Sequence, residues 1–259
     1  MTNVELLASI SHIARRAGDL ILQVYATDFS AAIKADASPV TQADQRAEAV
    51  IVACLAALSP GIPIVAEEAV AAGHVPDVSG GRFWLVDPLD GTKEFISRNG
   101  EFTVNIALIE QGVPVLGVVL APAIGGPGGR LFAGGQGLGA RVEDADGRRQ
   151  IRCRAVPAVG LTVLASRSHG DKARLDAFLA GRTVAQLKQA GSSLKLCVVA
   201  EGQADLYPRL SRTMEWDIAA GHAVLAAAGG SVCRADDGQP LTYGKPAFAN
   251  PHFVAAGTA

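Results

Sequence analysis

Residues 84–92 read WLVDPLDGT, an apolar strand pattern that runs directly into an acidic turn. The proline of this stretch fixes the backbone φ, so the chain is expected to turn after the strand. Asp87 and Asp90 are three residues apart across the turn and can return to one point in space. Gly91 permits a tight bend, after which the Gly91 and Thr92 amides open a helix that can bind an anion. An isolated D-P-x-D-G segment is usually a plain turn, so the pattern alone leaves both interpretations open.

Other acidic residues share one property, because each lies at the end of a predicted strand or the start of a predicted helix. They are Glu67, Glu68, Asp217 and Asp44. Strand ends converge on clefts in layered α/β folds. Carboxylates cannot gather in a cleft without a cation, and Mg²⁺ prefers carboxylate, carbonyl and water ligands. The sequence therefore predicts a Mg²⁺ site, to which the Leu89 carbonyl can contribute.

Hydrophobic periodicity predicts two long helices in the first half of the chain, over residues 4–26 and 41–59, with Thr41 as the second N-cap. Strands are predicted over 62–66, 82–86, 103–109 and 113–120, the last two as a pair. The glycine-dense stretch 124–139 is expected to form two short strands with turns. A phosphate cradle would instead require a strand, a glycine turn and a helix in succession.

The second half alternates between the two kinds of element, which favours a layered α/β arrangement. Strands are expected over 161–165, 184–187, 205–207, 231–233 and 252–254, and helices over 171–180, 193–200 and 217–228. We therefore expect an N-terminal α+β subdomain over 1–150 that carries most of the metal ligands. The α/β subdomain over 151–259 is expected to carry Asp217 and a second phosphate site.

Composition excludes several classes of protein. The 259 residues include 23 Lys and Arg against 25 Asp and Glu, a formal net charge of −2, which disfavours nucleic-acid binding. Hydrophobic residues make up 49%, which disfavours disorder. The N-terminus lacks a signal-peptide pattern, and no apolar run is long enough to span a membrane. Four widely spaced cysteines are typical of reduced thiols in a cytosolic protein.

Three stretches together resemble the inositol monophosphatase superfamily of Mg²⁺-dependent, lithium-sensitive phosphatases. They are WLVDPLDGTKEFISRNGEFTVNIAL (84–108), VAEEA (65–69) and EWDIAAG (215–221). The resemblance covers nearly the whole chain and implies a fold between α+β and α/β, the layered αβαβα sandwich of sugar phosphatases. KADASPVTQAD (34–44), SRSH (166–169) and GSSLKLCVVAEGQADLYPRL (191–210) are similar to the bacterial CysQ type of 3'(2'),5'-bisphosphate nucleotidase. Inositol monophosphatases typically carry a threonine-asparagine pair where this chain has Lys93-Glu94.

The resemblance assigns roles to particular residues. It places two or three Mg²⁺ ions on Glu67, Asp87, the Leu89 carbonyl, Asp90 and Asp217, with Glu68 as a neighbouring contact. It gives Asp44 and Thr92 the orientation and activation of the attacking water. It implies that substrate contacts come from the metal ligands and from Gly91, Thr92, His169, Ser192, Lys195 and Arg209.

Substrate choice requires a second phosphate site. Ser192 and Lys195 are three residues apart at a predicted helix start and would share a face, and Arg209 can add a guanidinium. Without the resemblance, a solvated surface Lys and Arg is the simpler interpretation. With it, these residues bind a 5'-phosphate, and the implied reaction converts 3'-phosphoadenosine 5'-phosphate to AMP and phosphate in sulfur assimilation and nucleotide recycling. The 5'-phosphosulfate form is an expected second substrate. His169 would lie near the base or ribose, unless it is an ordinary loop histidine.

Alternatives remain at this point. A phosphatase for inositol monophosphate or fructose 1,6-bisphosphate would share every metal ligand. A non-catalytic Mg²⁺-dependent anion-binding module would not need Asp44 and Thr92. Trp84 and Trp216 flank the acidic residues and are expected to pack rather than stack on a base. The partner is expected to be a small bisphosphorylated nucleotide, with no nucleic acid and no membrane span. A monomer and a homodimer are both open, as is a peripheral location at the inner membrane for this otherwise cytoplasmic protein.

Overall fold

The computed structural model describes residues 1–29, 31–33, 39–166 and 172–258. The helices are α1 (Asn3–Tyr25), α2 (Gln42–Leu58), α3 (Glu67–Ala71), α4 (Thr92–Ile96), α5 (Lys172–Leu179), α6 (Leu194–Ala200), α7 (Glu215–Ala227) and the 3₁₀ helix η1 (Pro246–Phe248). The strands are β1 (Ala31–Ile33), β2 (Pro39–Thr41), β3 (Ile64–Ala66), β4 (Arg82–Asp90), β5 (Thr103–Glu110), β6 (Val113–Ala121), β7 (Arg130–Gly135), β8 (Gly139–Asp144), β9 (Gly147–Ile151), β10 (Leu161–Ser166), β11 (Val184–Ala190), β12 (Leu206–Arg209), β13 (Ser231–Arg234) and β14 (Phe253–Ala256).

The larger sheet follows chain order, β3-β4-β5-β6-β7-β8-β9. Its β3–β4 pair is parallel, and the other neighbouring pairs are antiparallel. Residues alternate along β4, so that Leu85 belongs to the core on one face of the sheet and Trp84 to the core on the other. Both faces of the sheet are therefore buried.

The smaller sheet has the order β11-β10-β12-β14-β13. Strands β11, β10 and β12 are parallel, whereas β14 runs antiparallel to its neighbours β12 and β13. A further short pair joins β1 and β2.

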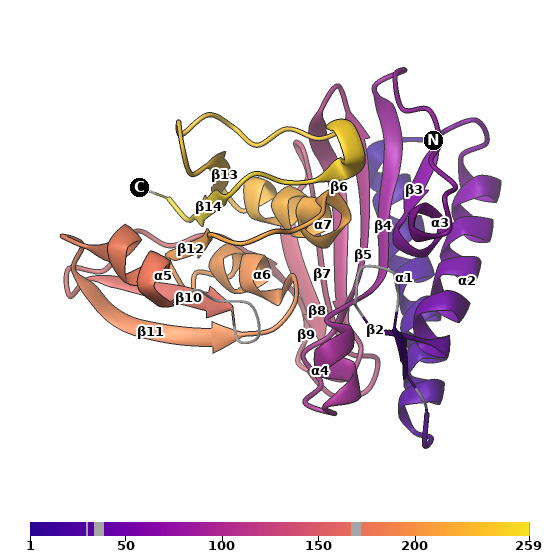
Figure 1. Ribbon diagram of the computed structural model, residues 1–259, viewed down its shortest axis with the longest axis horizontal. Coiled ribbons are helices and arrows are strands. Elements are labelled where there is room, and N and C mark those ends of the chain that lie inside the picture. Colours follow the sequence, from indigo (N-terminus) through magenta and orange to yellow (C-terminus); the bar gives the residue numbers. More distant parts are fainter. Residues whose placement is uncertain (30, 34–38, 167–171, 259) are drawn as a thin grey trace.

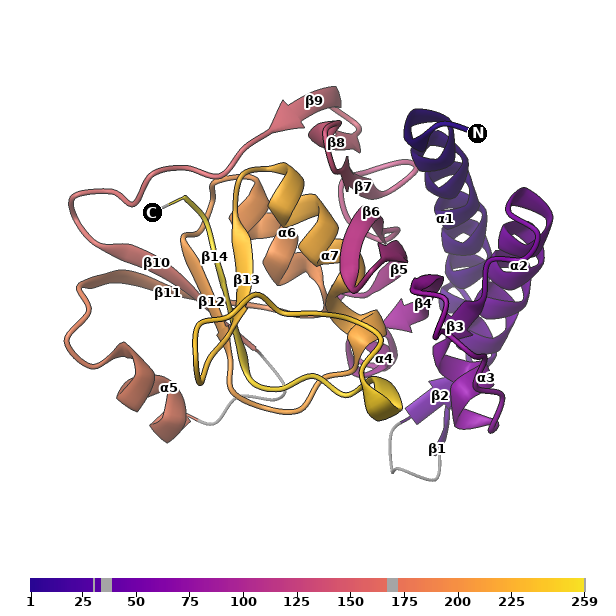
Figure 2. The same ribbon diagram turned by 90° about the horizontal axis from the view of Figure 1, so that it is seen from above.

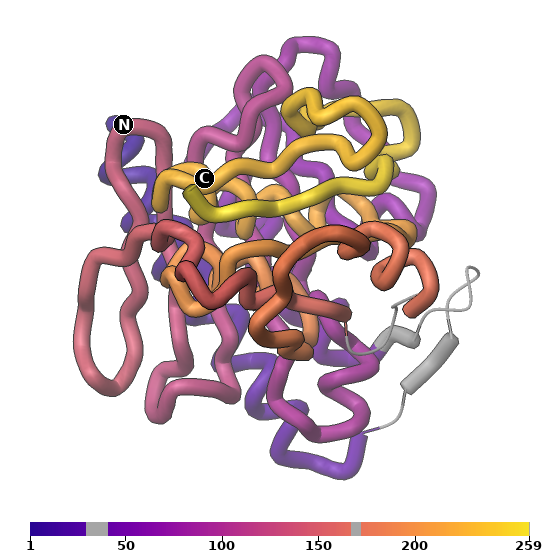
Figure 3. Tube along the Cα trace, turned by 90° about the vertical axis from the view of Figure 1, so that its left-hand side faces the viewer, coloured from indigo at the N-terminus to yellow at the C-terminus, as the bar shows by residue number. Residues whose placement is uncertain are grey.

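Helices and sheets stack in layers, as Figures 1 and 2 show. Helices α1 and α2 cover the outer face of the seven-stranded sheet, while α6 and α7 fill the space between the two sheets. Helix α5 lies on the outer side of the five-stranded sheet and buries none of its residues. Figure 3 looks onto that side and shows the C-terminal part of the chain, orange to yellow, in front of the indigo and purple N-terminal part. The predicted sandwich of helices and two sheets is confirmed.

Close packing of α7 on the larger sheet depends on glycine. A side chain on Gly117 of β6 would place its Cβ 2.4 Å from the Ala220 carbonyl oxygen and 2.7 Å from the Ala223 Cβ. The same holds at Gly134 of β7, where a Cβ would lie 2.9 Å from the Val224 Cα. Glycine thus lets the backbone of α7 approach the sheet directly, which brings the N-terminal end of α7 to the edge where β4 ends.

The N-terminus of α2 agrees with the prediction. Thr41 is the N-cap, and its side-chain oxygen accepts a hydrogen bond from the Ala43 amide at 3.1 Å. Asp44 accepts from the Thr41 amide at 2.8 Å and completes a capping box. This box fixes the position of the Asp44 carboxylate.

Two features of the seven-stranded sheet differ from prediction. Strand β4 does not end at Asp87, because pairing with β5 resumes at Asp90 after a local irregularity that contains Pro88. Proline has no N–H to donate to the neighbouring strand, and at such an irregularity no donor is needed. The strand therefore bends at Pro88 and continues. The polar strand β9 was not predicted because its sequence GRRQI has no apolar alternation.

Most of the other predicted elements exist within one or two residues of the expected bounds, although β11 extends three residues further than expected. The glycine-dense stretch forms strands β7 and β8, as predicted. The division into two subdomains at residue 150 stays a prediction. Residues from both sides of that position share the core between the two sheets, with Leu85 and Val119 on one side and Leu196 of α6 on the other.

Candidate active site

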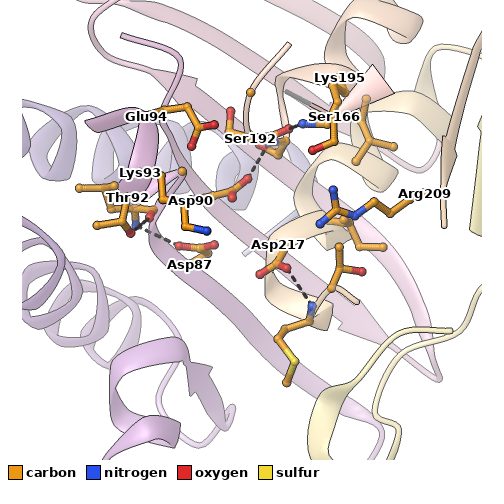
Figure 4. A pocket seen from close by; sticks show the side chains of 18 of the residues that line it. Asp87, Asp90, Thr92, Lys93, Glu94, Ser166, Ser192, Lys195, Arg209 and Asp217 are labelled. Carbon is orange, nitrogen blue, oxygen red and sulfur yellow. Dashed lines mark hydrogen bonds between the residues drawn. The ribbon is translucent and has the colours of Figure 1, made fainter. Parts of the chain in front are cut away.

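A cavity of about 450 Å³ lies where β4, α6, β12 and α7 meet. Nearly all of the predicted substrate and metal residues line it: Glu67, Asp87, Leu89, Asp90, Gly91, Thr92, Ser192, Lys195, Arg209 and Asp217. Residues that the sequence did not single out also line it, among them Ser193, Leu196, Tyr207, Arg212, Thr213, Met214 and Ile218. Figure 4 shows Asp87, Asp90 and Asp217 around the same space, with Arg209 across it from Asp87 and beside Asp217. The structure therefore brings together carboxylates from distant parts of the chain.

Asp87 is the most deeply placed of these carboxylates, with 1% of its surface exposed. The Leu89 amide donates to its Oδ1 at 3.0 Å, which closes the turn between the two aspartates. Burial raises the pKa of Asp87 well above its usual range, and the charges of Glu67, Asp90 and Asp217 and a hydrogen bond with Glu67 raise it further. Asp87 is thus at the centre of a cluster of like charges.

The other two aspartates are held by backbone amides. The Ser193 amide donates to Asp90 Oδ2 at 2.6 Å, and the Met214 amide donates to Asp217 Oδ2 at 2.8 Å. Burial raises the pKa of Asp90 to about 6, although Lys195 and the Ser193 amide partly oppose the shift. Burial and the charges of Asp90 and Glu67 raise the pKa of Asp217 well above its usual range. Backbone hydrogen bonds therefore fix both carboxylates in position, while burial and neighbouring negative charges make their ionised forms unfavourable.

The donor set fits a hard divalent cation. Within the described residues, no three His, Cys, Asp or Glu side chains lie close enough together to hold a metal ion as they stand. Mutual repulsion between buried carboxylates opposes such closeness, and a cation would relieve that repulsion. All of the converging side chains offer oxygen, the ligand type that Mg²⁺ prefers. The chemistry of the residues thus agrees with the predicted Mg²⁺ site.

Thr92 and Asp44 meet beside this cluster, as the sequence predicted. The Thr92 hydroxyl lies 3.3 Å from Asp44 Oδ1 and 3.4 Å from the Leu89 carbonyl oxygen, so it can donate its proton to either acceptor. Asp44 is 1% exposed, and its Oδ2 also accepts from the Thr41 hydroxyl at 2.7 Å. When the hydroxyl donates to one of these acceptors, the lone pairs of the Thr92 oxygen can accept a hydrogen bond from a water in the cavity.

The bend before α4 requires glycine. Gly91 is the N-cap of α4 and has a φ of 90°, a conformation that other residues rarely adopt. The first amides of a helix have no acceptor within the helix, and Gly91 and Thr92 both line the cavity. The predicted bend and helix start are therefore present, although α4 is only one turn long.

The turn before α6 corrects part of the sequence interpretation. Ser192 does not share a helical face with Lys195, because it precedes α6 and has a φ of 46°. Lys195 Nζ donates to the carbonyl oxygens of Ser192 at 2.6 Å and Ala190 at 3.2 Å. The ammonium thus holds the turn, and the Ser193 amide is bound to Asp90 rather than open to an anion.

Lys195 is not a solvated surface residue, since only 4% of it is exposed. Burial lowers its pKa to about 8, although the charge of Asp90 partly opposes the shift. Its ammonium also lies 5.4 Å from the centre of the Tyr207 ring. Lys195 therefore supplies buried positive charge to the cavity wall.

Ser193 was missed by the sequence interpretation, although it joins the two halves of the site. Its hydroxyl lies 2.7 Å from Asn105 Oδ1 and 2.8 Å from Thr103 Oγ1. Thr103 and Asn105 are the β5 residues paired with Asp90 and Asp87. The sequence analysis paired β5 with β6 and not with β4, so neither these β5 residues nor their partner in the distant α6 turn was predicted.

Arg209 lies across the cavity from Asp87 and beside Asp217, and Arg212 lines the cavity near it. One terminal Arg209 nitrogen donates to the Arg212 carbonyl at 3.2 Å, while its buried Nε has no hydrogen-bond partner among the described residues. Arg212 also lines the cavity and was not predicted, because a single arginine after a strand gives no distinctive pattern. The wall around Arg209 can therefore accept a second anionic group.

Several predicted residues lie elsewhere. His169 and residues 34–38 of the 34–44 stretch lie outside the described residues. Trp84 and Trp216 are buried, and Trp216 packs against Phe248 at 6.1 Å between ring centres, which confirms the packing role. No helix of the described residues is long and apolar enough to cross a membrane.

Comparisons with known proteins agree with this geometry. Residues 3–257 match the inositol monophosphatase family. The 3'(2'),5'-bisphosphate nucleotidase CysQ of Escherichia coli strain K12 is 48% identical over 252 residues, which covers 96% of this chain and 98% of that protein. CysQ from Bacteroides thetaiotaomicron has a crystal structure that superimposes with a TM-score of 0.82 at 35% identity, covering 99% and 98% of the two chains. The inositol monophosphatase from Anabaena sp. PCC 7120 gives a TM-score of 0.76 at 27% identity, over 98% and 92%.

Proposed function

Since this chain belongs to the inositol monophosphatase family, we propose that it is a phosphomonoesterase that converts 3'-phosphoadenosine 5'-phosphate to AMP and phosphate. The observation that carries the proposal is the cavity itself, where clustered carboxylates face basic side chains. The carboxylate wall suits a metal-assisted hydrolysis, and the basic wall suits a second phosphate on the same substrate. The 5'-phosphosulfate form of the nucleotide is the second substrate that we propose.

Phosphatases of this family are generally Mg²⁺-dependent, and the residues that would hold Mg²⁺ here are Glu67, Asp87, Asp90, Asp217 and the Leu89 carbonyl. When bound, Mg²⁺ would lower the pKa of a coordinated water and neutralise charge on the phosphoryl group. These four carboxylates around one cavity carry enough negative charge for more than one Mg²⁺ ion, and we propose that two or three bind.

Thr92 and Asp44 would activate the attacking water. Asp44 is fixed by the capping box of α2 and accepts the Thr92 proton at 3.3 Å. The Thr92 oxygen is then oriented to accept a hydrogen bond from a water beside the phosphorus, and it can take that water's proton as it passes its own to Asp44. A module that only binds anions has no use for this pair, so the pair favours catalysis over simple binding.

The start of α4 would stabilise the phosphoryl group during its transfer. Gly91 and Thr92 line the cavity next to the carboxylates, and the first amides of α4 have no acceptor within the helix. Amides fixed in place before the reaction stabilise charge that develops on the phosphoryl oxygens in the transition state. Lys195 and Arg209 would bind the 5'-phosphate, with Ser192 contributing its hydroxyl.

A comparison of substrates tests the proposal. We expect kcat/KM for 3'-phosphoadenosine 5'-phosphate to exceed that for inositol 1-phosphate by at least about 100-fold, since a site built for two phosphates leaves charges unpaired with only one. Fructose 1,6-bisphosphate is the control, because it has two phosphates without a base. An equal or higher kcat/KM for either sugar phosphate would contradict the nucleotide assignment, and absence of Mg²⁺-dependent phosphate release would contradict the enzyme.

A further inference from the structure

Glu48 is a buried carboxylate for which the mechanism above has no role. It lies on α2, and only 7% of it is exposed. Its Oε2 accepts from the Glu68 amide at 2.7 Å, and its Oε1 accepts from the Ala69 amide at 2.8 Å. Both amides belong to the first turn of α3, which begins at Glu67. Glu48 therefore binds the helix that carries a candidate metal ligand.

Helix α3 lacks a local cap. Its N-cap residue Ala66 provides no side-chain hydrogen bond, and the helix is only five residues long. The first amides of any helix have no acceptor within the helix, and a five-residue helix is too short to be stable by itself. Glu48 supplies the missing acceptors from α2, which lies beside α3 in Figures 1 and 2.

The same face of α2 also carries Asp44, one turn before Glu48. Two buried carboxylates at this spacing repel each other, so their presence requires compensating partners. Asp44 is compensated by the Thr41 amide and hydroxyl and by Thr92, and Glu48 by the two α3 amides. One helix thus fixes both the water-activating threonine and the turn that holds Glu67.

We propose that Glu48 is a positioning residue that fixes the Glu67 turn relative to Thr92 and thereby sets the affinity of the site for divalent cations. It acts through the backbone of α3 and touches neither substrate nor metal. The inference rests on the proposed function only in assigning Glu67 to a metal site. Loss of the residues that orient metal ligands typically weakens metal binding by about 10- to 100-fold.

The variant Glu48→Gln tests this role with little change in volume. The amide keeps one acceptor oxygen, but its NH₂ group faces the second α3 amide, so one of the two hydrogen bonds is lost. We expect Mn²⁺ binding to the substrate-free protein, measured by the electron paramagnetic resonance of unbound Mn²⁺, to weaken by about 10- to 100-fold. With saturating Mg²⁺, kcat should recover toward that of the wild type and the KM for substrate should change by less than about threefold.

Asp205→Asn is the matched control. Asp205 is equally buried and accepts the Thr162 amide at 2.7 Å, but it belongs to the region of the five-stranded sheet and does not line the cavity. This variant should bind Mn²⁺ as the wild type does, even if it is less stable. Should Glu48→Gln fail to fold, Glu48→Asp keeps the charge but is too short to reach both amides, and the same weakening is expected.

Mn²⁺ affinity within about twofold of the wild type in a folded Glu48 variant would overturn the proposal, as would equal weakening in Asp205→Asn. Because Mn²⁺ binding is measured without substrate, this result is independent of which phosphate ester the protein hydrolyses. Absence of nucleotide hydrolysis by the wild type would instead refute the proposed function alone.

Discussion

Replacing Asp90 with asparagine should make the metal-free protein more stable while removing its activity. Burial raises the pKa of Asp90 from its ordinary 3.8 to about 6, and the charges of Glu67 and Glu94 add to this effect while Lys195 opposes it. One pKa unit corresponds to about 1.4 kcal/mol, so the ionised carboxylate costs the folded state about 3 kcal/mol. Asparagine avoids this cost, and its side-chain oxygen can still accept from the Ser193 amide.

The sign of the pH dependence follows from the raised pKa. The folded protein holds the Asp90 proton more tightly than the unfolded chain, so the stability of the metal-free wild type falls as the pH rises from about 4 to 6. Asp90→Asn has no such proton. Its advantage over the wild type should therefore grow from less than about 1 kcal/mol at pH 4 to about 3 kcal/mol at pH 7.5.

Chemical unfolding in EDTA at several pH values measures this difference, and added Mg²⁺ should then stabilise the wild type far more than the variant. Asp205→Asn is a control for which we expect the opposite change in stability. Although burial raises the pKa of Asp205, hydrogen bonds from Arg154 and the Thr162 amide outweigh it and lower the pKa, so this variant should lose stability at pH 7.5. The reasoning is refuted if Asp90→Asn is less stable than the wild type in EDTA at pH 7.5, or if its advantage does not depend on pH.

Three further predictions address the mechanism, the substrate and the fold. Thr92→Ala should lower kcat by about 10²- to 10⁴-fold with Mn²⁺ affinity unchanged, because it removes only the water-activating hydroxyl; a kcat near wild type would exclude that role. Arg209→Gln should raise the KM for the bisphosphorylated nucleotide at least about tenfold and leave that for a simple monoester nearly unchanged, in steady-state assays of both substrates; equal increases would place Arg209 outside the second phosphate site. Gly117→Ala should cost at least about 1–3 kcal/mol in denaturant unfolding, because the new Cβ meets the Ala220 carbonyl at 2.4 Å; unchanged stability would show that α7 can move away from the sheet.

Much of the carboxylate site could be predicted because its signals are local. The Asp87–Asp90 turn, the Thr41 cap with Asp44, and the acidic start of α7 each depend on residues within a few positions of one another. Local chemistry of this kind is fixed by propensity and capping before any tertiary packing. The resemblance to a known family then grouped these separate signals into one site.

The basic wall was harder to predict because it depends on tertiary contacts. The helical spacing of Ser192 and Lys195 suggested a shared face, but the backbone before α6 is left-handed and Lys195 binds the carbonyl of Ser192 instead. The role of Ser193 follows only from its contacts with β5, about 90 residues earlier in the chain. Neither feature has a periodic signal in the sequence.

Helix α7, pressed between the two sheets, makes the completion of the site a late event during biosynthesis. The acidic turn at 87–90 leaves the ribosome more than a hundred residues before Asp217, and chains of this size generally acquire structure from the N-terminus onward. Until α7 docks on Gly117 and Gly134, the last carboxylate is missing. A nascent or truncated polypeptide that lacks α7 should therefore lack the Asp217 carboxylate and should not hydrolyse phosphate esters.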